Sequence, residues 1–455
     1  MAEPRVIIVG AGPAGVRAAE RLVRAGRRPL IVDEATAAGG QIYRRQPANF
    51  RRKAGELYGF EAGKAEAVHR AFAALRSEID YRPETLAWAV YDEMLQLVSP
   101  RGQDAVPFDA LILTTGATDR IMPVPGWTKP GVTSLGGAQI ALKAQACAIG
   151  ARPVFLGTGP LLYLVAYQYA KAGVKAAAVL DTSPFIDRIK ALPALAARPS
   201  MLAKGLYYSA WLLRNRVPLL TGIAPVAIEG DQRVTGIHFR DLDGGEHRVA
   251  CDAVGLGYGL RSETQLADLA GCRFAFDPQS RQWLPETDRD GRTSIPNVYL
   301  AGDAARIAGA DAAELAGRLA ACAVLADLGD DIPQAEFGRL RKGLARIARF
   351  RQGLERAFPW PVHLAATYPD EALVCRCDAI TAGELRRSAQ ALGASEINRA
   401  KAFSRVGMGR CQGRYCGHAA AEMLAASLNA PVETVGRLRG QAPVKPLPLA
   451  AEARA

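Results

Sequence analysis

RVIIVGAGPAGVRAAERLVRAG, residues 5–26, is the stretch that decides the fold. Its apolar run from Val6 to Val9 predicts a buried strand, and the segment after the glycines has apolar residues at helical spacing. PLIVDE, residues 29–34, predicts a second strand. Strand, glycine-rich turn, helix and strand in this order predict a Rossmann-like dinucleotide-binding unit at the start of the chain.

The turn itself has the composition of a phosphate-binding loop. A glycine permits a tight turn, a second lets the backbone approach a pyrophosphate, and a third lets helix and strand pack closely. The residues predicted for this role are Gly10, Gly12, Pro13, Ala14 and Gly15. Asp33 ends the next strand, where a carboxylate can accept hydrogen bonds from a ribose, and Glu34 is the alternative one residue later.

Three further motifs favour FAD over NAD as the bound dinucleotide. They are Gly40-Gln41 after the acidic strand end, Thr115-Gly116, and Gly302-Asp303. In this order the motifs resemble the FAD-binding pattern of flavoprotein reductases with two dinucleotide folds, and the resemblance implies that Asp303 contacts the ribityl or pyrophosphate region. A helix expected to open near Ala312 would direct its N-terminus toward the flavin.

A second strand-turn-helix pattern follows about 150 residues after the first, with the turn Gly157-Thr158-Gly159-Pro160-Leu161-Leu162. Leu162 stands where the third glycine belongs, and the next strand ends at Asp181 without an Arg pair for a 2′-phosphate. We expect a Rossmann-like fold that does not work as a nicotinamide site. A working NAD(P) site and a site for another nucleotide remain the alternatives.

The motifs divide the chain into expected domains. The prediction is a discontinuous FAD-binding domain (1–127 and 272–357), an inserted NAD(P)-like domain (128–271), a linker (358–370), a cluster domain (371–437) and a Pro-rich tail (438–455). Residues 186–215 are unusually apolar, aromatic and basic. We expect helices there that pack on this chain or on a partner, with a membrane-surface helix as the alternative.

Four of the eight cysteines form two close pairs, Cys375-x-Cys377 and Cys411-x₄-Cys416. Thr381 and Glu384 form a capping box, so the first pair precedes a helix. Four thiolates suit zinc or a [2Fe-2S] cluster, and this spacing resembles the bacterioferritin-associated-ferredoxin type of cluster domain rather than a zinc knuckle. Arginines 405, 410 and 414 would offset the cluster's charge.

The remaining cysteines and one histidine are expected to play no part in the chemistry. We expect Cys147, Cys251, Cys272 and Cys322 to be small buried residues, and His418 to be exposed and not a ligand. No CxxC or CxxxxC stands beside the predicted flavin site, which excludes disulfide reductase chemistry.

Bulk properties exclude several classes of protein. The chain has 455 residues and a formal charge of +12, but its basic residues are dispersed and not interleaved with aromatics, which argues against a nucleic-acid partner. No apolar run is long enough for an integral membrane segment, and no signal peptide is evident. A cytoplasmic location is expected, with peripheral attachment to the inner membrane through a complex left open.

Taken together, the chain resembles the large accessory subunit of the opine oxidase, hydrogen cyanide synthase and hydroxyproline dehydrogenase family. The motifs that carry the resemblance are GGQIYRR, GGAQIALKAQ, GTGPLL, VGLGYGL, RTSIPNVYLAGD, VCRCD, GMGRCQGRYC and PVKPLPL. The fold class implied is α/β, a two-dinucleotide-binding-domain flavoprotein of the glutathione-reductase type with a small C-terminal helical [2Fe-2S] domain.

The resemblance also implies partners. An amino-acid-oxidase-like catalytic subunit would oxidise an amine or amino acid, and electrons would pass to the FAD and cluster of this chain. Members of the family often hold an FMN at the subunit interface and a small ferredoxin-like third subunit. No catalytic acid or base is predicted near the flavin here. The alternatives are a self-sufficient NAD(P)H-dependent reductase and a structural scaffold.

Overall fold

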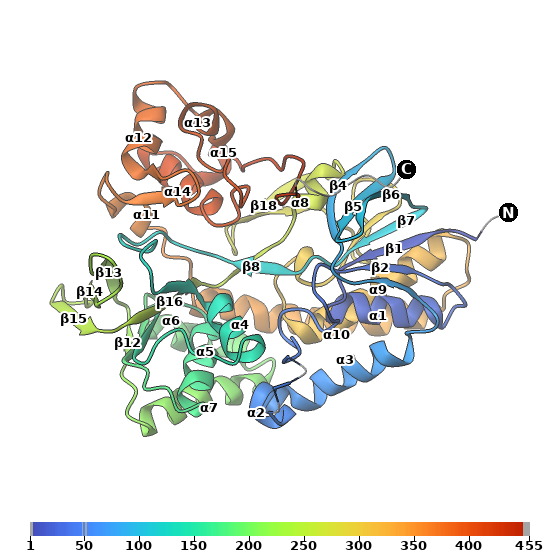
Figure 1. Cartoon of the computed structure of the whole chain (residues 1–455), viewed down its shortest axis with the longest axis horizontal. Coiled ribbons are helices and arrows are strands. Elements are labelled where there is room, and N and C mark those ends of the chain that lie inside the picture. Colours follow the sequence, from blue (N-terminus) through green and yellow to red (C-terminus); the bar gives the residue numbers. More distant parts are fainter. Residues whose placement is uncertain (1–2, 48, 51, 449–455) are drawn as a thin grey trace.

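The computed structural model describes residues 3–47, 49–50 and 52–448, and Figure 1 shows three parts that surround the middle of the molecule. The N-terminal part contains a five-stranded parallel sheet, two inner strands of which are β1 (Val6–Val9) and β2 (Leu30–Val32). The order is β20-β7-β1-β2-β3, completed by β3 (Asp80–Arg82), β7 (Ala110–Leu113) and β20 (Val298–Leu300). Strand β20 therefore returns beside β7 from far along the chain.

Helices cover this sheet because its strands are apolar on both faces. Helix α1 (Pro13–Val23) packs against α9 (Ala310–Asp327), and α3 (Ala62–Ala74) lies beside α1. An antiparallel sheet of β4 (Leu86–Tyr91), β5 (Met94–Ser99) and β6 (Gly102–Pro107) contributes to the apolar cluster on the other side. The predicted βαβ unit is thus present.

The second part repeats this plan. Its parallel sheet has the order β12-β11-β10-β16-β9, and helices α4 (Leu135–Ala144) and α5 (Pro160–Lys171) pack on it. The strands are β9 (Val132–Ser134), β10 (Pro153–Thr158), β11 (Ala178–Asp181), β12 (Leu219–Thr221) and β16 (Ala253–Tyr258). A small antiparallel sheet follows β12, formed by β13 (Ala224–Glu229), β14 (Gly236–Arg240) and β15 (Glu246–Ala250).

A two-stranded antiparallel ribbon joins the two parts. Strand β8 (Ala117–Asp119) pairs with β17 (Leu260–Ser262), and Figure 1 shows β8 extended across the middle of the molecule. The next helix, α8 (Gln265–Leu269), already packs against the apolar side of the first sheet. A hairpin of β18 (Phe274–Asp277) and β19 (Gln282–Pro285) then leads back to β20.

The apolar and basic segment forms two helices, α6 (Phe185–Leu195) and α7 (Pro199–Arg214). Helix α6 packs on α10 (Gln334–Ala357), and α7 packs on α5, so part of the segment is covered by this chain as predicted. The opposite face is open to solvent. Its exposed large apolar side chains are Phe185, Ile186, Ile189, Leu192, Leu206, Tyr207 and Leu213.

The cysteine-bearing part is a compact helical unit. Helices α12 (Ala382–Gln390) and α13 (Ile397–Ser404) pack together with α14 (Gly417–Leu428) and α15 (Val432–Val435). The hairpin of β21 (Leu373–Cys375) and β22 (Ile380–Thr381) precedes α12, and the predicted capping box of Thr381 and Glu384 is present. Several apolar residues of this unit share one cluster with the second sheet.

The segment expected as a linker, 358–370, is not a free connection. It contains the short helix α11 (Leu364–Thr367), which packs on α14, and it buries Trp360 and Tyr368. The indole nitrogen of Trp127 donates to the carbonyl of Leu373 just beyond this segment. The Pro and Trp residues that resemble a chain breaker therefore belong to the packed base of the cluster unit.

The described part of the tail, 438–448, lies against the rest of the protein. The amide of Val444 donates to the carbonyl of Trp88, Lys445 pairs with Glu34, and the amide of Gly440 donates to Asp268, which also pairs with Arg437 just before the tail. Residues 449–455 of the predicted tail lie outside the described residues. Within the described ranges, no helix is both long enough and apolar enough to cross a bilayer.

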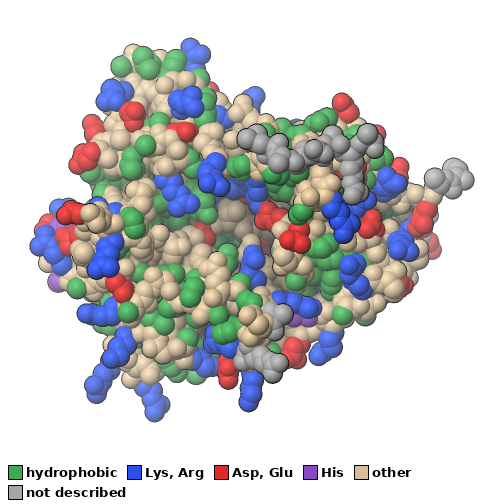
Figure 2. All heavy atoms as spheres, in the orientation of Figure 1, with side chains coloured by type: hydrophobic (Ala, Val, Ile, Leu, Met, Phe, Trp, Pro, Cys, Tyr) green, Lys and Arg blue, Asp and Glu red, His purple; other side chains and the backbone are tan. Residues whose placement is uncertain are grey.

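Lys and Arg side chains are scattered over the visible face, without a continuous basic surface, and the middle of this face is hollowed (Figure 2). Two expectations on single residues are wrong. Cys147 is exposed, because it lies in the turn after α4 rather than within an element. His418 is largely buried, because it follows Cys416 into α14 and packs on Trp360.

Candidate flavin and cluster sites

The glycine turn after β1 is built so closely that side chains cannot enter it. A Cβ on Gly10 would lie 2.6 Å from the carbonyl oxygen of Thr114, and one on Gly15 would lie 1.9 Å from that of Gly10. Gly12 faces the backbone of Gly40, whose φ of 63° places it in the left-handed region. The N-terminus of α1, with Pro13 at its start, therefore faces open space that suits a pyrophosphate.

The two candidate ribose carboxylates have different surroundings. Asp33 accepts hydrogen bonds from the amides of Ala11, at 2.5 Å, and Ala35, at 2.7 Å, so it also fixes the glycine turn. Burial raises its pKa, against the effect of these amides. Glu34 is exposed and pairs with Lys445 at the rim. Both line the same cavity, so both remain candidates.

This cavity has a volume of 1170 Å³ and runs from the glycine turn to the second domain. Most of the predicted FAD residues line it: Gly10, Gly12, Pro13, Ala14, Asp33, Glu34, Gly40, Gln41, Thr115, Gly116 and Asp303. Gly15, Gly302 and Ala312 are not among the lining residues. Gly15 and Gly302 instead permit close packing, and the start of α9 meets the cavity through Ala310, Asp311 and Ala313, with Gly309 just before it.

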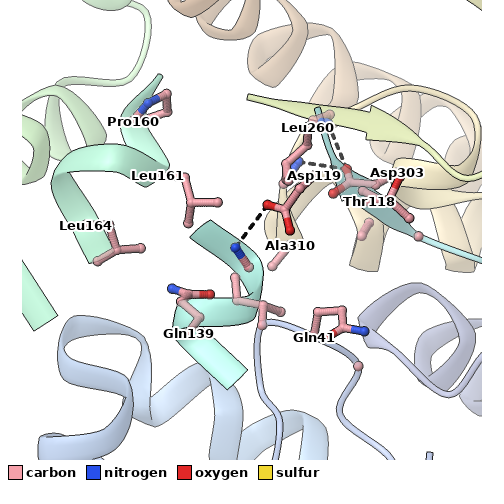
Figure 3. A pocket seen from close by; sticks show the side chains of 18 of the residues that line it. Gln41, Thr118, Asp119, Gln139, Pro160, Leu161, Leu164, Leu260, Asp303 and Ala310 are labelled. Atoms are coloured by element: carbon pink, nitrogen blue, oxygen red, sulfur yellow. Dashed lines mark hydrogen bonds between the residues drawn. The ribbon is translucent and has the colours of Figure 1, made fainter. Parts of the chain in front are cut away.

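The far end of the cavity is walled by the ribbon, α4 and the start of α9 (Figure 3). One carboxylate oxygen of Asp303 accepts the amides of Ala308, at 2.8 Å, and Gly309, at 3.0 Å, and so shapes the turn into α9. Across from it, Asp119 accepts the amide of Gly136 at 3.0 Å, and burial raises the pKa of this carboxyl. Figure 3 shows Gln41 and Asp303 on one side of this part of the cavity, and Gln139, whose amide nitrogen donates to Gln168 at 3.0 Å, nearer to Leu164.

The second glycine turn differs from the first in one respect. Leu162 is fully buried in an apolar cluster at the position of the third glycine, whereas a Cβ on Gly157 would lie 1.7 Å from the carbonyl oxygen of Gly257. The close approach in this turn is therefore to the neighbouring strand, β16. Asp181 is fully buried and already bonded to the Tyr163 hydroxyl and to Arg188.

The four predicted cluster ligands come together. Cys416 hydrogen-bonds with both Cys375 and Cys411, and Cys377 with Cys411. The bond with Cys416 lowers the pKa of Cys375 to about 6 and that of Cys411 to about 5, which favours the thiolate form of these two cysteines. The same bonds raise the pKa of Cys416, and burial raises that of Cys377. The described residues contain no group of three or more His, Cys, Asp or Glu arranged to hold one metal ion. A two-iron centre divides its four thiolates between two irons.

The charges around the cysteines are only partly those predicted. Arg405 and Arg410 are exposed, while Arg414 is buried and paired with Glu263 at 2.7 Å. The buried cation that the prediction missed is Arg261 of β17, which donates to the carbonyls of Gly413 and Arg414. Arg261 interacts electrostatically with Cys411 and Cys416.

One loop belongs to both sites. Residues 412–415 lie between Cys411 and Cys416, and Arg414 and Tyr415 of this loop line the flavin cavity. Glu263, which pairs with Arg414, follows the ribbon, and its backbone carbonyl accepts the hydroxyl of Thr115, a predicted FAD residue, at 2.5 Å. The cluster loop therefore forms part of the cavity wall.

Sequence reasoning missed four residues at these sites: Asp119, Lys143, Arg261 and Glu263. They come from the ribbon, the residues just after it and α4, which carry no motif of their own. Lys143 stands in the predicted stretch GGAQIALKAQ, four residues after Gln139 on a helix, and this spacing was the only signal that it shares a face with a cavity-lining residue.

With this geometry in view, the chain belongs to the family described as pyridine nucleotide-disulphide oxidoreductase, which matches residues 4–319. A BFD-like [2Fe-2S] binding domain matches residues 373–426. The chain thus carries FAD and a [2Fe-2S] cluster. The glycine cradle and the four converging thiols fit these two groups.

Known relatives cover nearly the whole chain. An opine oxidase subunit of Agrobacterium tumefaciens is 37% identical over 98% of this chain and 90% of its own length. The HcnB subunit of hydrogen cyanide synthase from Pseudomonas aeruginosa is 31% identical over 98% of both. The crystal structure of L-proline dehydrogenase from P. horikoshii matches at a TM-score of 0.72 and 19% identity, covering 99% of this chain and 79% of that one, which shows a common fold.

Proposed function

We propose that this chain is the electron-transferring subunit of a multi-subunit dehydrogenase that acts on an amine or amino acid of the opine, proline, hydroxyproline or glycine type. A partner subunit similar to amino-acid oxidases would remove electrons from the substrate. This chain would then pass them through FAD and the cluster. Bound FAD supplies a centre that takes up two electrons and can release them singly to iron.

The observation that carries the proposal is the shared loop. Tyr415 and Arg414 line the flavin cavity and stand next to Cys416 in sequence, so a single loop separates the two redox groups. Arg261 of the ribbon and the pair of Arg414 with Glu263, just after the ribbon, hold this loop against the segment that joins the two domains. Such direct packing supports electron transfer between centres within one rigid unit.

Two features support a partner as the electron source. The turn of the second domain has Leu162 in place of a glycine. Arg188 and the Tyr163 hydroxyl donate hydrogen bonds to Asp181, so the carboxylate that usually accepts hydrogen bonds from an NAD ribose is already engaged. The relatives, in turn, are named as subunits of opine oxidase and hydrogen cyanide synthase. Another nucleotide in the second domain, an FMN at the interface and a small ferredoxin-like subunit remain part of this proposal.

The test is an anaerobic titration of the assembled complex. The chain is co-expressed with an amino-acid-oxidase-like subunit encoded beside it, and secondary amino acids are added while flavin absorbance and the EPR signal of the cluster are followed. We expect substrate to reduce the cluster only when the partner is present, and NADH and NADPH to leave both centres oxidised.

A variant without the cluster distinguishes an electron-transferring subunit from a structural scaffold. In Cys411→Ser, substrate should still bleach the flavin, but electrons should not reach an external acceptor. If the wild-type cluster is never reduced by substrate, the chain is a scaffold. If the chain remains monomeric and its centres respond to NAD(P)H alone, it is a self-sufficient reductase.

A further inference from the structure

Lys143 is a buried lysine in the wall of the flavin cavity, contributed by α4 of the second domain. Its side chain is only 4% exposed, yet it lines the cavity together with Gln139, which lies one turn earlier on the same helix face. Its amino group makes one hydrogen bond, to the carbonyl of Ile42 at 3.3 Å, and lies 6.0 Å from the ring of Tyr58.

This cation has no anion. Among the described residues, no carboxylate lies within 4 Å of the Lys143 amino group, and the seven carboxylates that line the cavity are engaged elsewhere. Asp33 and Asp303 accept backbone amides, as does Asp119. The other four form ion pairs: Glu34 with Lys445, Glu61 with Lys204, Glu263 with Arg414, and Asp311 with Lys64 and Arg198.

A buried charge without a partner is costly, so an unpaired one in a ligand cavity calls for an anion brought by the ligand. The bound FAD offers two. Its pyrophosphate is accounted for by the glycine turn and α1 of the first domain. Its ring system becomes negative when two electrons and one proton are added, and Lys143 lies on the wall formed by α4, in the same cavity as Gln41 and Asp303.

We propose that Lys143 is a positioning residue for flavin redox chemistry: its ammonium group is the counter-charge of the reduced flavin and raises the flavin's midpoint potential. The second domain would then serve the flavin through this lysine, whether or not it binds a nucleotide of its own. The inference rests on the bound FAD and not on which partner supplies the electrons.

The protonation of Lys143 gives the pH behaviour. Burial lowers its pKa to about 8 in the absence of an anion, so the lysine is charged below that pH and loses its charge above it. The groups that face it are the Tyr58 ring and the Ile42 carbonyl. Among the other charged residues of the cavity wall nearby, Glu61 and Lys64 are paired, and Arg44 donates to Gln41. The increase in flavin midpoint potential due to Lys143 should therefore be largest at pH 6 and should decrease as the pH rises above the lysine's pKa.

The test measures the flavin potential of the full-length chain, purified with FAD and cluster and without a partner. Reduction by xanthine and xanthine oxidase is followed against dyes of known potential, in buffer free of carboxylates. In Lys143→Met we expect the oxidised-to-reduced flavin ratio at a fixed potential to rise at least tenfold at pH 6, which is about 30 mV for a two-electron couple. Lys143→Arg should retain the wild-type ratio.

Controls keep the result specific. Lys175→Met removes an exposed lysine of the same domain and should change nothing. The EPR-monitored cluster potential should be equal in all variants, and the FAD content reports whether each variant is folded. Equal flavin potentials in Lys143→Met and wild type would overturn the proposal, as would a difference that persists undiminished at pH 10. If the flavin potential shifts in Lys143→Met but no partner delivers electrons to this chain, the proposed function is wrong and the inference about Lys143 still holds.

Discussion

At the residue scale, the third position of the glycine motif distinguishes the two dinucleotide-type turns. A Cβ on Gly15 would collide with the backbone of Gly10, so α1 begins directly at the end of its own strand, whereas the corresponding position of the second domain holds the buried side chain of Leu162. The third position of the motif therefore differs between the two turns: there is no room for a side chain in the first, and a buried leucine fills it in the second.

The first prediction concerns Gly15→Ala. Its methyl group would lie 1.9 Å from the backbone oxygen of Gly10, and backbone cannot move aside as a side chain can. We expect loss of bound FAD and a destabilisation of about 1–3 kcal/mol, typical of overpacking. Gly63→Ala in α3, where nothing lies within 4 Å, is the matched control and should keep its FAD. Flavin absorbance per protein and thermal unfolding measure the two effects.

The second prediction concerns the cluster ligands. Cys411→Ser should purify without the cluster's visible absorbance but with its FAD, because no cysteine ligand lines the flavin cavity. Cys147→Ser, at an exposed position, should retain both groups. Full cluster content in Cys411→Ser would show that the four-cysteine assignment is wrong.

Sequence reasoning could locate residues that belong to a motif. The glycines after β1, the acidic strand end and the two cysteine pairs are each specified by neighbours within a few positions; the glycines and Asp33 meet at one turn, and the four cysteines contact one another. Lys143, Asp119 and Glu263 could not be found in this way. Their environment arises only when α4, the ribbon and the cluster loop, far apart in sequence, pack around one cavity.

At the element scale, ion pairs connect the segment of α6 and α7, residues 185–214, to the start of α3 and to α9 on the other side of the cavity. Asp311, at the start of α9, pairs with Arg198 and Lys64, and Glu61 pairs with Lys204 and Lys64. Sequence patterning predicted helices in this segment that pack on this chain or on a partner. It could not reveal the ion pairs, because their partners lie in another domain.

The third prediction is that Asp311→Asn lets the segment of α6 and α7 detach from α9 more often. Each partly buried pair is worth up to about 1 kcal/mol, so the loss of one or two should raise the open population several-fold. Limited trypsin digestion should cut near Arg198 and Lys204 correspondingly faster than in the wild type. Asp331→Asn, at an exposed position just before α10, should be cut at the wild-type rate; equal rates in both variants would contradict the role of Asp311.

The fourth prediction concerns the pair between the cluster loop and the ribbon. Burial raises the pKa of Glu263, but the charges of Arg414 and Arg261 outweigh it, so the net pKa is lowered. The carboxylate therefore stabilises the fold above its unfolded pKa, and this contribution is lost as the pH falls through the lower folded value. Glu263→Gln leaves Arg414 buried without a counter-charge and should cost about 3–5 kcal/mol at pH 7.

The measurement is urea unfolding of the holoprotein at pH 7 and at pH 4, with Arg414→Met and the double variant completing a cycle. The coupling between the two residues should be large at pH 7 and smaller at pH 4. Additive effects at pH 7 would mean that the two side chains do not act as a pair.

At the scale of the whole molecule, the three parts meet around one cavity. The two sheets resemble the arrangement predicted from the repeated motifs, and the cluster unit was expected from its cysteines. Their mutual contact was not. It depends on Arg261, Trp360 and the segment 358–370, which has the composition of a connection but is buried against α14.

The fifth prediction tests the tail. Truncation after Gln441 removes the Val444–Trp88 hydrogen bond and the Lys445–Glu34 pair, while the contacts of Arg437 with Asp268 remain. We expect the cluster to be retained and FAD to dissociate several-fold faster, as measured by flavin fluorescence on dilution. Truncation after Pro448 removes only residues outside the described part and should not alter the rate.

The contact of Lys445 with Glu34 has a consequence for how the protein is made. The ribosome delivers the glycine turn long before residues 444 and 445, which belong to the wall of the same cavity. Stable flavin loading must therefore wait until the iron-binding unit has been synthesised and has docked. A nascent chain or a degradation product that lacks residues 444 and 445 would accordingly hold its flavin weakly, even with an intact glycine turn.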